Sequence, residues 1–510
     1  DNSTFIDNTN EINMKNGDIK YTNFTSSSTP ILTATGSVNF IETKFNGDYP
    51  SRNYIIGQFT SDKYGEYIVL NELVKNAAAG STLYLHNKTY VLNQSVTISK
   101  NIVIHGGNSS GDNLFSTVNG LNTYRLFYID AAYTVTFINI NFINGIVNNA
   151  NGGAIYAPNA NSKINVTNCS FTNNKAKSTG TSGHGGAIYG TTVTITSSNF
   201  TSNTATSTNT KGGYGGAISG TTVTVLDSNF YNNYASGVGG GIYGSTKVNA
   251  TKSIFINNTA DQPIRVTWRG GGGICSDVEA YVYDSIFINN TARCRGGAVS
   301  VETTLYVSNS NFTNNTAESA GGALNNYKYT TVVNSTFIGN KANDYGGGAI
   351  MWNGYTDVKI SFSTFINNTS ASNGGALFFE STSNQLSLVD SVFIGNKAIV
   401  SGGAIYDQSG VAMTILRTNF TNNTPNAISR ASTSGLTGTI TDSNFNAQNI
   451  PFISNKGGII TLTNSKFNGE KPSFNYIVGN FQTNNGTSPY INLADAINNC
   501  PGGGNLFLNN

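Results

Sequence analysis

The chain has 510 residues, only 11% of them charged, and its formal net charge at pH 7 is +2. Its 28 basic residues form no cluster or stripe, which argues against nucleic acid as a partner. The sequence contains no apolar run of about 18 residues, so we expect no membrane insertion of this segment.

The two ends of the chain are related in sequence. Residues 45–57 match residues 467–479, an offset of 467 − 45 = 422, and residues 67–87 match residues 490–510. We interpret residues 1–66 as the C-terminal tail of a preceding tandem copy plus a linker. Residues 467–510 are then a linker and the start of a following copy. This predicts a domain over 67–466 within a long, multi-domain surface rod.

The predicted domain begins with a helix over residues 67–79. Apolar residues recur there at helical spacing, and Gly80 ends the pattern. A strand follows at residues 82–85. A short amphipathic helix in this place would cap the open end of a solenoid and hide strand edges from other chains.

A repeat fills residues 137–424. Gly-Gly pairs follow Phe-x-x-Asn segments such as Phe287 to Asn290, in steps of 24 to 33 residues. The second glycines are Gly153, Gly186, Gly216, Gly240, Gly272, Gly297, Gly322, Gly348, Gly375 and Gly403. Each unit is short and rich in Thr, Val, Ile, Asn and Gly, and three short β-segments are expected in each coil. The repeat predicts an all-β fold, a three-sided parallel β-helix of about 14 coils, rather than an α-helical solenoid.

Three residue types have structural roles in this fold. Glycine permits a tight corner and a close approach of neighbouring coils. The phenylalanines are expected to stack in the core beside the asparagines. The side-chain amides are expected to form a hydrogen-bonded ladder inside the turn, through Asn258, Asn290, Asn315, Asn340 and Asn368.

Gly-Gly-Ala-Ile followed by Phe-x-x-Asn resembles the repeats of chlamydial polymorphic outer membrane proteins. The Asn- and Thr-rich version looks like the adhesin-like surface proteins of methanogenic archaea, over about residues 67–450. The helix followed by Thr82-Leu83-Tyr84-Leu85 looks like the N-terminal cap of pectate-lyase-like β-helices. The resemblance implies an extracellular, right-handed parallel β-helix used for adhesion or as a stalk. It implies no catalytic residue, cofactor or metal.

Three longer turns are the first candidate binding feature. From Phe to the next second glycine, most coils have 10 or 11 residues, but 186 − 171 = 15, 216 − 200 = 16 and 272 − 255 = 17. Residues 176–184, 205–213 and 260–270 should therefore form neighbouring loops on one edge, where solenoids bind partners. These loops contain the candidates His184, Arg265, Trp268 and Arg269.

A column of aromatic residues is the second candidate feature. Alternation along the strand puts the aliphatic residue after each glycine pair inside and the next residue outside. The aromatic candidates at or beside this outward position are Tyr156, Tyr189, Tyr243, Trp352, Phe378 and Tyr406. Exposed aromatic rings suit stacking on a sugar or packing on a protein. Cross-coil stacking and β-propensity explain the same residues without a ligand.

Cysteines and sequons add two further expectations. Cys275 and Cys294 should lie roughly 20 Å apart along the strand direction, against a Cα limit of about 7 Å, so free thiols are expected. Candidate glycosylation sites include Asn23, Asn87, Asn249 and Asn485. In a chain so rich in Asn, Ser and Thr the pattern also arises by chance, and sequons inside the Phe-x-Asn-Asn-Thr turn could be buried in the ladder.

The favoured function is a non-enzymatic cell-surface adhesin or stalk, with a glycan or a protein on a host or neighbouring cell as partner. The alternative is a structural fibre or cell-envelope layer in which neighbouring copies assemble end to end. A polysaccharide lyase or glycoside hydrolase is less favoured, because such enzymes group carboxylates for acid/base work. Gly183-His184-Gly185 matches a short polygalacturonase-like motif but overlaps an ordinary glycine pair.

Overall fold

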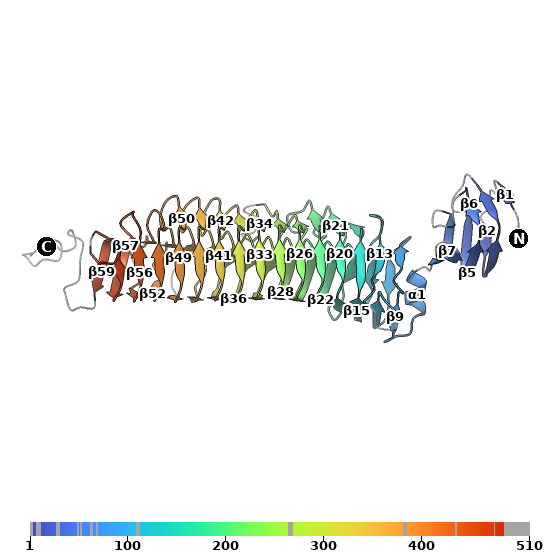
Figure 1. The fold of residues 1–510 in the computed structure, drawn as a ribbon, viewed down its shortest axis with the longest axis horizontal. Helices are drawn as coiled ribbons and strands as arrows, with labels where there is room; N and C mark the ends of the chain where they lie inside the picture. The colour runs from blue at the N-terminus through green and yellow to red at the C-terminus, as the bar shows by residue number, and fades with distance from the viewer. Residues whose placement is uncertain are drawn as a thin grey trace, which may run out of the picture.

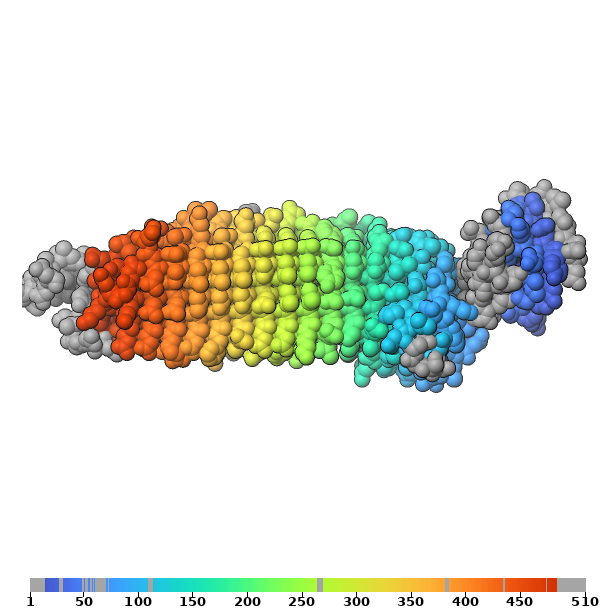
Figure 2. All heavy atoms as spheres, viewed as in Figure 1, coloured from blue at the N-terminus to red at the C-terminus, as the bar shows by residue number. Residues whose placement is uncertain are grey.

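The computed structural model describes residues 4–6, 12–26, 31–47, 50, 54–61, 65–67, 70–108, 113–263, 269–380, 385–433, 436–473 and 475–483. The chain forms an elongated parallel β-solenoid, with its coils stacked along the long axis (Figure 1). In the space-filling view the coils are successive bands across the rod (Figure 2). The candidates Arg265, Trp268 and Asn485 lie outside the described residues.

Sheet 1 has 26 strands and usually receives two strands from each coil. Its strands are β9 (Thr82–Tyr84), β11 (Val96–Ile98), β12 (Ile102–His105), β14 (Phe127–Ile129), β15 (Thr134–Ile138), β18 (Ile155–Ala157), β19 (Lys163–Thr167), β22 (Ile188–Thr196), β25 (Ile218–Leu226), β28 (Ile242–Thr251), β31 (Ile274–Ser276), β32 (Glu279–Tyr283), β35 (Val299–Val301), β36 (Thr304–Ser308), β39 (Leu324–Asn326), β40 (Tyr329–Val333), β43 (Ile350–Trp352), β44 (Val358–Ser361), β47 (Leu377–Phe379), β48 (Gln385–Val389), β51 (Ile405–Asp407), β52 (Ala412–Leu416), β54 (Ile428–Arg430), β55 (Gly438–Thr441), β57 (Ile453–Thr463) and β59 (Ile477–Thr483).

Sheet 2 has 15 strands, one from each coil, so 14 turns separate its first strand from its last. Its strands are β10 (Thr89–Val91), β13 (Ser116–Asn119), β16 (Ile140–Ile143), β20 (Ser170–Thr172), β23 (Asn199–Thr201), β26 (Asn229–Tyr231), β29 (Ile254–Ile256), β33 (Ile286–Ile288), β37 (Asn311–Thr313), β41 (Thr336–Ile338), β45 (Thr364–Ile366), β49 (Val392–Ile394), β53 (Asn419–Thr421), β56 (Asn444–Asn446) and β58 (Lys466–Phe467).

Sheet 3 has 10 strands and forms the remaining side of the central coils. Its strands are β17 (Ile146–Asn148), β21 (Lys175–Ser178), β24 (Thr204–Ser207), β27 (Tyr234–Ala235), β30 (Thr259–Ala260), β34 (Thr291–Ala292), β38 (Thr316–Ala317), β42 (Lys341–Ala342), β46 (Thr369–Ser370) and β50 (Lys397–Ala398).

The predicted parallel, three-sided solenoid of about 14 coils is confirmed. The segments after the glycine pair and before the Phe both lie in sheet 1, so they do not form two different sides. In β22 and β25 they form one continuous strand. The third side comes instead from the two-to-four-residue strands after the Asn, such as Thr316–Ala317. These strands are too short to show a period in the sequence.

A short helix, α1 (Leu70–Asn76), packs on the first coils. Leu70 and Val74 are buried in the same core as the solenoid strands. Lys100 Nζ donates hydrogen bonds to the carbonyls of Lys75 and Ala77, so a side chain satisfies the C-terminal end of the helix. This core continues past residue 466, to Ile477 and Phe481 in β59.

The N-terminal residues form a smaller unit with its own core. One sheet contains β1 (Thr4–Ile6), β4 (Asn23–Thr25) and β6 (Lys44–Phe45), and another contains β2 (Ile12–Met14), β3 (Gly17–Lys20), β5 (Leu32–Ile41), β7 (Ile55–Ser61) and the antiparallel β8 (Gly65–Tyr67). Phe45 stacks on Tyr54 with ring centroids 5.8 Å apart, as Phe467 stacks on Tyr476 at 5.9 Å. The unit thus repeats the packing of the last coils of the solenoid.

The two glycines of each pair have different roles. Gly296, a first glycine, has φ +72°, in the left-handed region that favours glycine, and a Cβ there would overlap the carbonyl of Val299. Gly297, a second glycine, has no such φ, but its Cβ would overlap the carbonyl of Gly322 in the next coil. The first glycine makes the corner and the second lets the coils stack.

The predicted ladder and ring stack are confirmed and run further than the five asparagines that predicted them. The Nδ2 of each ladder residue donates to the Oδ1 of the next at 2.9–3.0 Å, through Asn174, Asn203, Asn233, Asn258, Asn290, Asn315, Asn340, Asn368, Asn396 and Asn423. Beside it, phenylalanine rings from Phe142 to Phe467 stack with centroids 4.3–5.1 Å apart.

A second ladder of hydroxyl groups was not predicted from the sequence. Two residues before each Phe, a backbone N–H donates to the Oγ of the serine in the next coil, as from Ser285 to Ser310 at 3.1 Å. Cys169 occupies this position in its coil, where its N–H donates to Ser198 Oγ. Burial raises the pKa of the Cys169 thiol to about 12. Cys275 and Cys294 form no disulfide with each other, as predicted.

The sequons within the Phe-x-Asn-Asn-Thr turn are not buried in the ladder. The sequon residue is the first asparagine, for example Asn314, which is exposed and left-handed with φ +53°. The second asparagine, Asn315, is the ladder member. Asn23 and Asn87 are exposed and Asn249 is half-buried. Glycosylation of these residues stays a prediction.

Candidate functional site

We call the residues that follow the inward aliphatic positions the outer column. They are Tyr156, Tyr189, Ser219, Tyr243, Cys275, Ser300, Asn325, Met351, Phe378 and Tyr406, and each pairs in register with its neighbour. The tyrosines of the column are half-buried, whereas every member from Cys275 to Phe378 is buried. One position of the repeat therefore has two environments along the rod.

Short turns cover the buried part of the outer column. Ala320 lies two residues before its second glycine and packs in one cluster with Met351 and Phe378. Successive turns also pair with one another, with parallel bridges from Ala320 to Gly346 and from Gly346 to Asn373. The turns thus form a continuous cover over this face of sheet 1.

The exposure predicted for Phe378 and Trp352 is wrong for two different reasons. Phe378 points outward, but the turns bury it to 2% exposure, with Tyr345 packed edge-on at 5.3 Å. Trp352 lies one residue beyond the outer column, so strand alternation places it inside the core. Its Nε1 donates to the carbonyl of Lys328 at 2.7 Å.

The longer turns lie side by side, as predicted from their lengths. Thr208 N–H donates to the carbonyl of Ser178, and Gly213 N–H donates to the carbonyl of Ser182. Gln262 Nε2 donates to the carbonyl of Thr210 at 3.0 Å, which connects the start of the third long turn to the second. Beside these turns the tyrosines of the outer column are half-buried, and Ser219 between them is 3% exposed.

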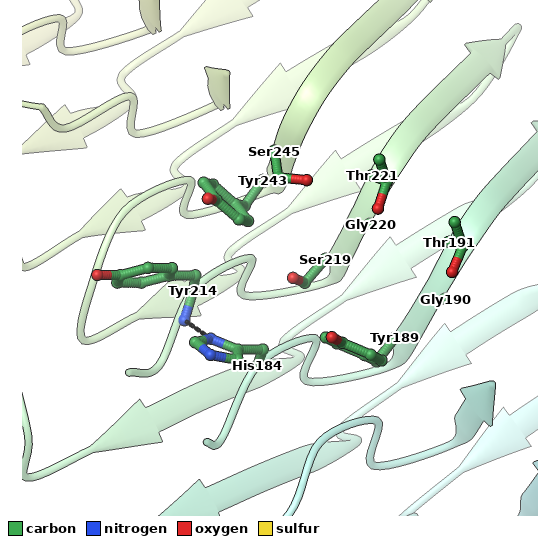
Figure 3. A pocket seen from close by; sticks show the side chains of 10 residues that line it. All are labelled: His184, Tyr189, Gly190, Thr191, Tyr214, Ser219, Gly220, Thr221, Tyr243 and Ser245. Atoms are coloured by element: carbon green, nitrogen blue, oxygen red, sulfur yellow. Dashed lines mark hydrogen bonds between the residues drawn. The ribbon is translucent and has the colours of Figure 1, made fainter. Parts of the chain in front are cut away.

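A slot opens at this edge, where Ser219 interrupts the tyrosines of the outer column. Its volume is about 180 Å³, and it is lined by His184, Tyr189, Gly190, Thr191, Tyr214, Ser219, Gly220, Thr221, Tyr243 and Ser245. In Figure 3 the rings of Tyr189, His184, Tyr214 and Tyr243 surround Ser219, and Thr191 and Thr221 form a row on the other side. We call this space the slot.

Neighbouring ring contacts hold the aromatic wall of the slot together. The His184 ring centroid lies 6.3 Å from that of Tyr189 and 4.9 Å from that of Tyr214. The Tyr214 centroid lies 5.1 Å from that of Tyr243. The wall therefore joins two outer-column tyrosines through two turn residues.

His184 is held neutral. Its Nδ1 accepts a hydrogen bond from Tyr214 N–H at 3.1 Å, so the neutral ring carries its hydrogen on Nε2. Burial lowers the pKa of His184 to about 4. Burial also raises the pKa of Tyr189 and Tyr214, so at neutral pH the aromatic wall has no charge.

Arg269 supports the slot from outside. It forms ion pairs with Asp277 and with Glu302, the latter at 3.2 Å. Asp277 also accepts a hydrogen bond from the Tyr243 hydroxyl at 2.7 Å. Burial and then the Asp277 carboxylate raise the pKa of Tyr243 well above its usual value. Arg269 and Asp277 thus fix the Tyr243 ring while neutralising each other.

The remaining candidates do not line the slot. Tyr156 stacks toward Tyr189 at 5.5 Å, and the guanidinium of Arg125 lies 4.5 Å over its ring. Tyr406 stacks on Phe378 at 5.4 Å, at the other end of the outer column. The structure therefore brings together three predicted residues, His184, Tyr189 and Tyr243.

Sequence analysis did not single out Tyr214 or Ser219. Tyr214 lies two residues before its second glycine, the position that His184 occupies in the preceding coil. Ser219 is the small residue between two tyrosines of one column. Comparing each repeat position with its neighbours in both columns would have identified them.

The slot lining includes no carboxylate. Asp227, Asp284, Asp390 and Asp442 share a corner position with left-handed φ in separate coils, and Asp390 pairs there with Arg417. Over the described part of the chain, no group of three or more His, Cys, Asp or Glu side chains could hold a metal ion. No helix in those ranges has the length and apolar character needed to cross a membrane.

Four segments match the Chlamydia polymorphic membrane protein repeat: residues 168–191, 284–302, 362–380 and 390–408. Each begins at or before the Phe and extends through the ladder asparagine to the glycine pair, and the first contains His184 and Tyr189. Comparison with curated proteins and with solved structures found no match. The chain is therefore a β-solenoid repeat protein that contains segments similar to these chlamydial repeats.

Proposed function

We propose that this chain is a non-enzymatic, extracellular adhesin segment of a cell-surface protein. The slot carries the proposal, because it places four rings and a row of hydroxyl groups beside the long turns at one edge of sheet 1. The matched chlamydial repeats support a place on an outer surface. The partner would be a glycan or protein on a host or neighbouring cell.

The composition of the slot favours binding over catalysis. General acid/base cleavage of a glycosidic bond needs two carboxyl groups flanking it. The slot lining supplies none, and Asp277 behind it already bonds to Arg269 and Tyr243. The Asn- and Thr-rich repeats, similar to adhesin-like proteins of methanogenic archaea, agree with a binding role.

A structural fibre is the second candidate function. It is favoured by the likeness between the N-terminal unit and the last coils of the solenoid, which share a ring stack and a bulged strand pair. The bulges lie between Ala34 and Ser37 and between Asn455 and Ile460. Repetition of this packing suits a long rod built from consecutive copies. Such a rod would serve as a stalk that positions a binding surface.

Adhesion of beads coated with the purified chain to whole cells tests the proposal. The variant shortens the long turn 205–213 to the length of the equivalent ordinary turn, 292–294, and we expect it to abolish adhesion. The matched control is Ile399→Ser with Val400→Ser, because these side chains are 71% and 61% exposed on an ordinary turn. No adhesion by either wild type or the turn variant would overturn the adhesin proposal and leave the fibre.

A further inference from the structure

We propose that the slot binds one uncharged pyranose ring of a surface glycan, with the sugar lying over Ser219 between Tyr189 and Tyr243. This inference rests on the proposed adhesin function and specifies its ligand. It depends on the width of the slot, its lack of charge and the arrangement of its polar groups.

The width follows from strand register. Ser219 pairs with Tyr189 in the preceding coil and with Tyr243 in the next. Neighbouring strands lie about 4.8 Å apart, so the backbones of the two tyrosines are about 10 Å apart. Carbon atoms in contact need about 3.5–4.0 Å on each side of a ligand. The distance between the two tyrosine backbones, less these contact distances, leaves room for one saturated ring between them and not for two.

The volume agrees with a single sugar residue. The slot encloses about 180 Å³. Pockets for drug-sized ligands are usually about 300–1,000 Å³. A terminal or side-branch monosaccharide fits this space, while the rest of the glycan would extend into solvent beyond the turns.

The chemistry of the lining favours a neutral sugar. A pyranose has apolar C–H faces and a rim of hydroxyl groups, which suit the aromatic wall and the hydroxyls of Thr191, Thr221 and Ser245. Thr191 Oγ1 already donates to the carbonyl of Asn159 at 3.0 Å, so it faces a ligand as an acceptor. The neutral His184 ring adds an uncharged face to the same lining.

The same lining disfavours charged ligands. An acidic sugar needs a cation, and the nearby Arg269 is bound to Asp277 and Glu302. Aromatic cages also bind quaternary ammonium groups. Here the row of hydroxyls would face the methyl groups of such a cation, and the slot lining offers no carboxylate.

Filling the slot is the sharpest test. Ser219→Tyr would continue the tyrosine column through the gap and occupy the space of the ligand. Thr224→Tyr is the matched control, because residue 224 is an outward position on the same strand, β25, about 16 Å along it. Both variants should keep the wild-type circular dichroism spectrum and unfolding midpoint.

Binding is measured by saturation-transfer NMR with methyl glycosides of neutral hexoses and N-acetylhexosamines, beside glucuronic acid and choline. Wild type and Thr224→Tyr should bind at least one uncharged glycoside. Ser219→Tyr should lose at least about tenfold in affinity, the equivalent of one good aromatic contact. Preference for choline or glucuronic acid, no binding of any glycoside, or unchanged binding by Ser219→Tyr would each overturn the inference.

The cell-adhesion assay separates this inference from the proposed function. If the shortened turn abolishes adhesion but Ser219→Tyr still adheres, the adhesin proposal stands and the pyranose inference fails. If both variants adhere like wild type, the slot is not the adhesive site and the pyranose inference fails. If wild type does not adhere, the adhesin proposal itself fails. Loss of adhesion in both, with Thr224→Tyr unaffected, supports both.

Discussion

The solenoid has two stretches that share one repeat and differ at one face. In the first, around Tyr156 to Tyr243, the long turns leave the outer column partly open. In the second, from Cys275 to Phe378, short turns cover the column and bury it. The inner face is the same in both, because the asparagine ladder and the phenylalanine stack continue through them. The shared interior thus gives the same stabilising contacts in both stretches, whereas the exposure of the outer column differs between them.

The largest expected effect comes from removing a covered aromatic side chain. Phe378→Ala should destabilise its coil by about 3–5 kcal/mol, because the ring is 2% exposed and packs against Met351 and Tyr345. The corresponding Tyr189→Ala in the open stretch should cost only about 1 kcal/mol, since that ring is already half-solvated. Denaturation midpoints and hydrogen exchange of β47 and β22 measure both. Equal losses would mean that the two stretches do not differ in packing.

The ladder should be equally important in both stretches. Asn315→Ala and Asn203→Ala each leave buried donors of the preceding asparagine and a phenylalanine carbonyl unpaired. Each should cost about 2–4 kcal/mol in urea unfolding.

The control for the ladder is Asn314→Gly. Glycine stands at the same left-handed position in residues 339 and 395, so we expect a change within about 0.5 kcal/mol. A much smaller loss for Asn203→Ala than for Asn315→Ala would contradict a uniform interior.

Adding a large side chain to the outer column, instead of removing one, should also distinguish the two stretches. Ser300 is fully buried under a short turn, so Ser300→Tyr should destabilise by about 1–3 kcal/mol through overpacking. Ser219 is also buried, at 3% exposure, but it lines the slot, so Ser219→Tyr should be tolerated because its ring enters that space. The comparison is made by thermal unfolding of the two variants, and a destabilised Ser219→Tyr would show that the slot is not free space.

The smallest effect is the pH dependence of the open stretch. The pKa of His184 is lowered to about 4 in the folded chain, so the unfolded chain binds more protons below its ordinary value of 6.5. Stability from the neutral ring is complete above about pH 6.5 and is lost as the pH falls toward 4, by about 1 kcal/mol between 6.5 and 5.5. His184→Gln should remove this part of the slope in unfolding experiments at matched pH values. An unchanged slope would place the His184 ring in solvent.

The sequence was sufficient for the interior because the same physical requirement recurs in every coil. A buried amide must find a partner, and the equivalent amide one coil away recurs at the same corner, so Asn258 and Asn290 already imply the ladder. The serine ladder had a similar signal, a serine or threonine two residues before each repeat Phe from Phe200 to Phe467, but our prediction used only the asparagine column.

The outer column shows where sequence reasoning stops. Alternation correctly placed Tyr189 and Phe378 on the outward face, but their exposure depends on turns from neighbouring coils. Those turns are adjacent in space through hydrogen bonds such as Ser178 to Thr208, which no single repeat encodes. Trp352 was misplaced for a simpler reason, since one residue of shift along a strand exchanges outside for inside.

The sequence by itself determined the period, the inward residues, the corners and the lack of charge, because each depends on local backbone geometry or on identical residues stacked in register. Only the tertiary structure decided which outward residues meet a turn and which face the slot. The exposure of an outward residue depends on the paths of turns from different coils. The packing of these turns on sheet 1 cannot be read from the sequence pattern of one repeat.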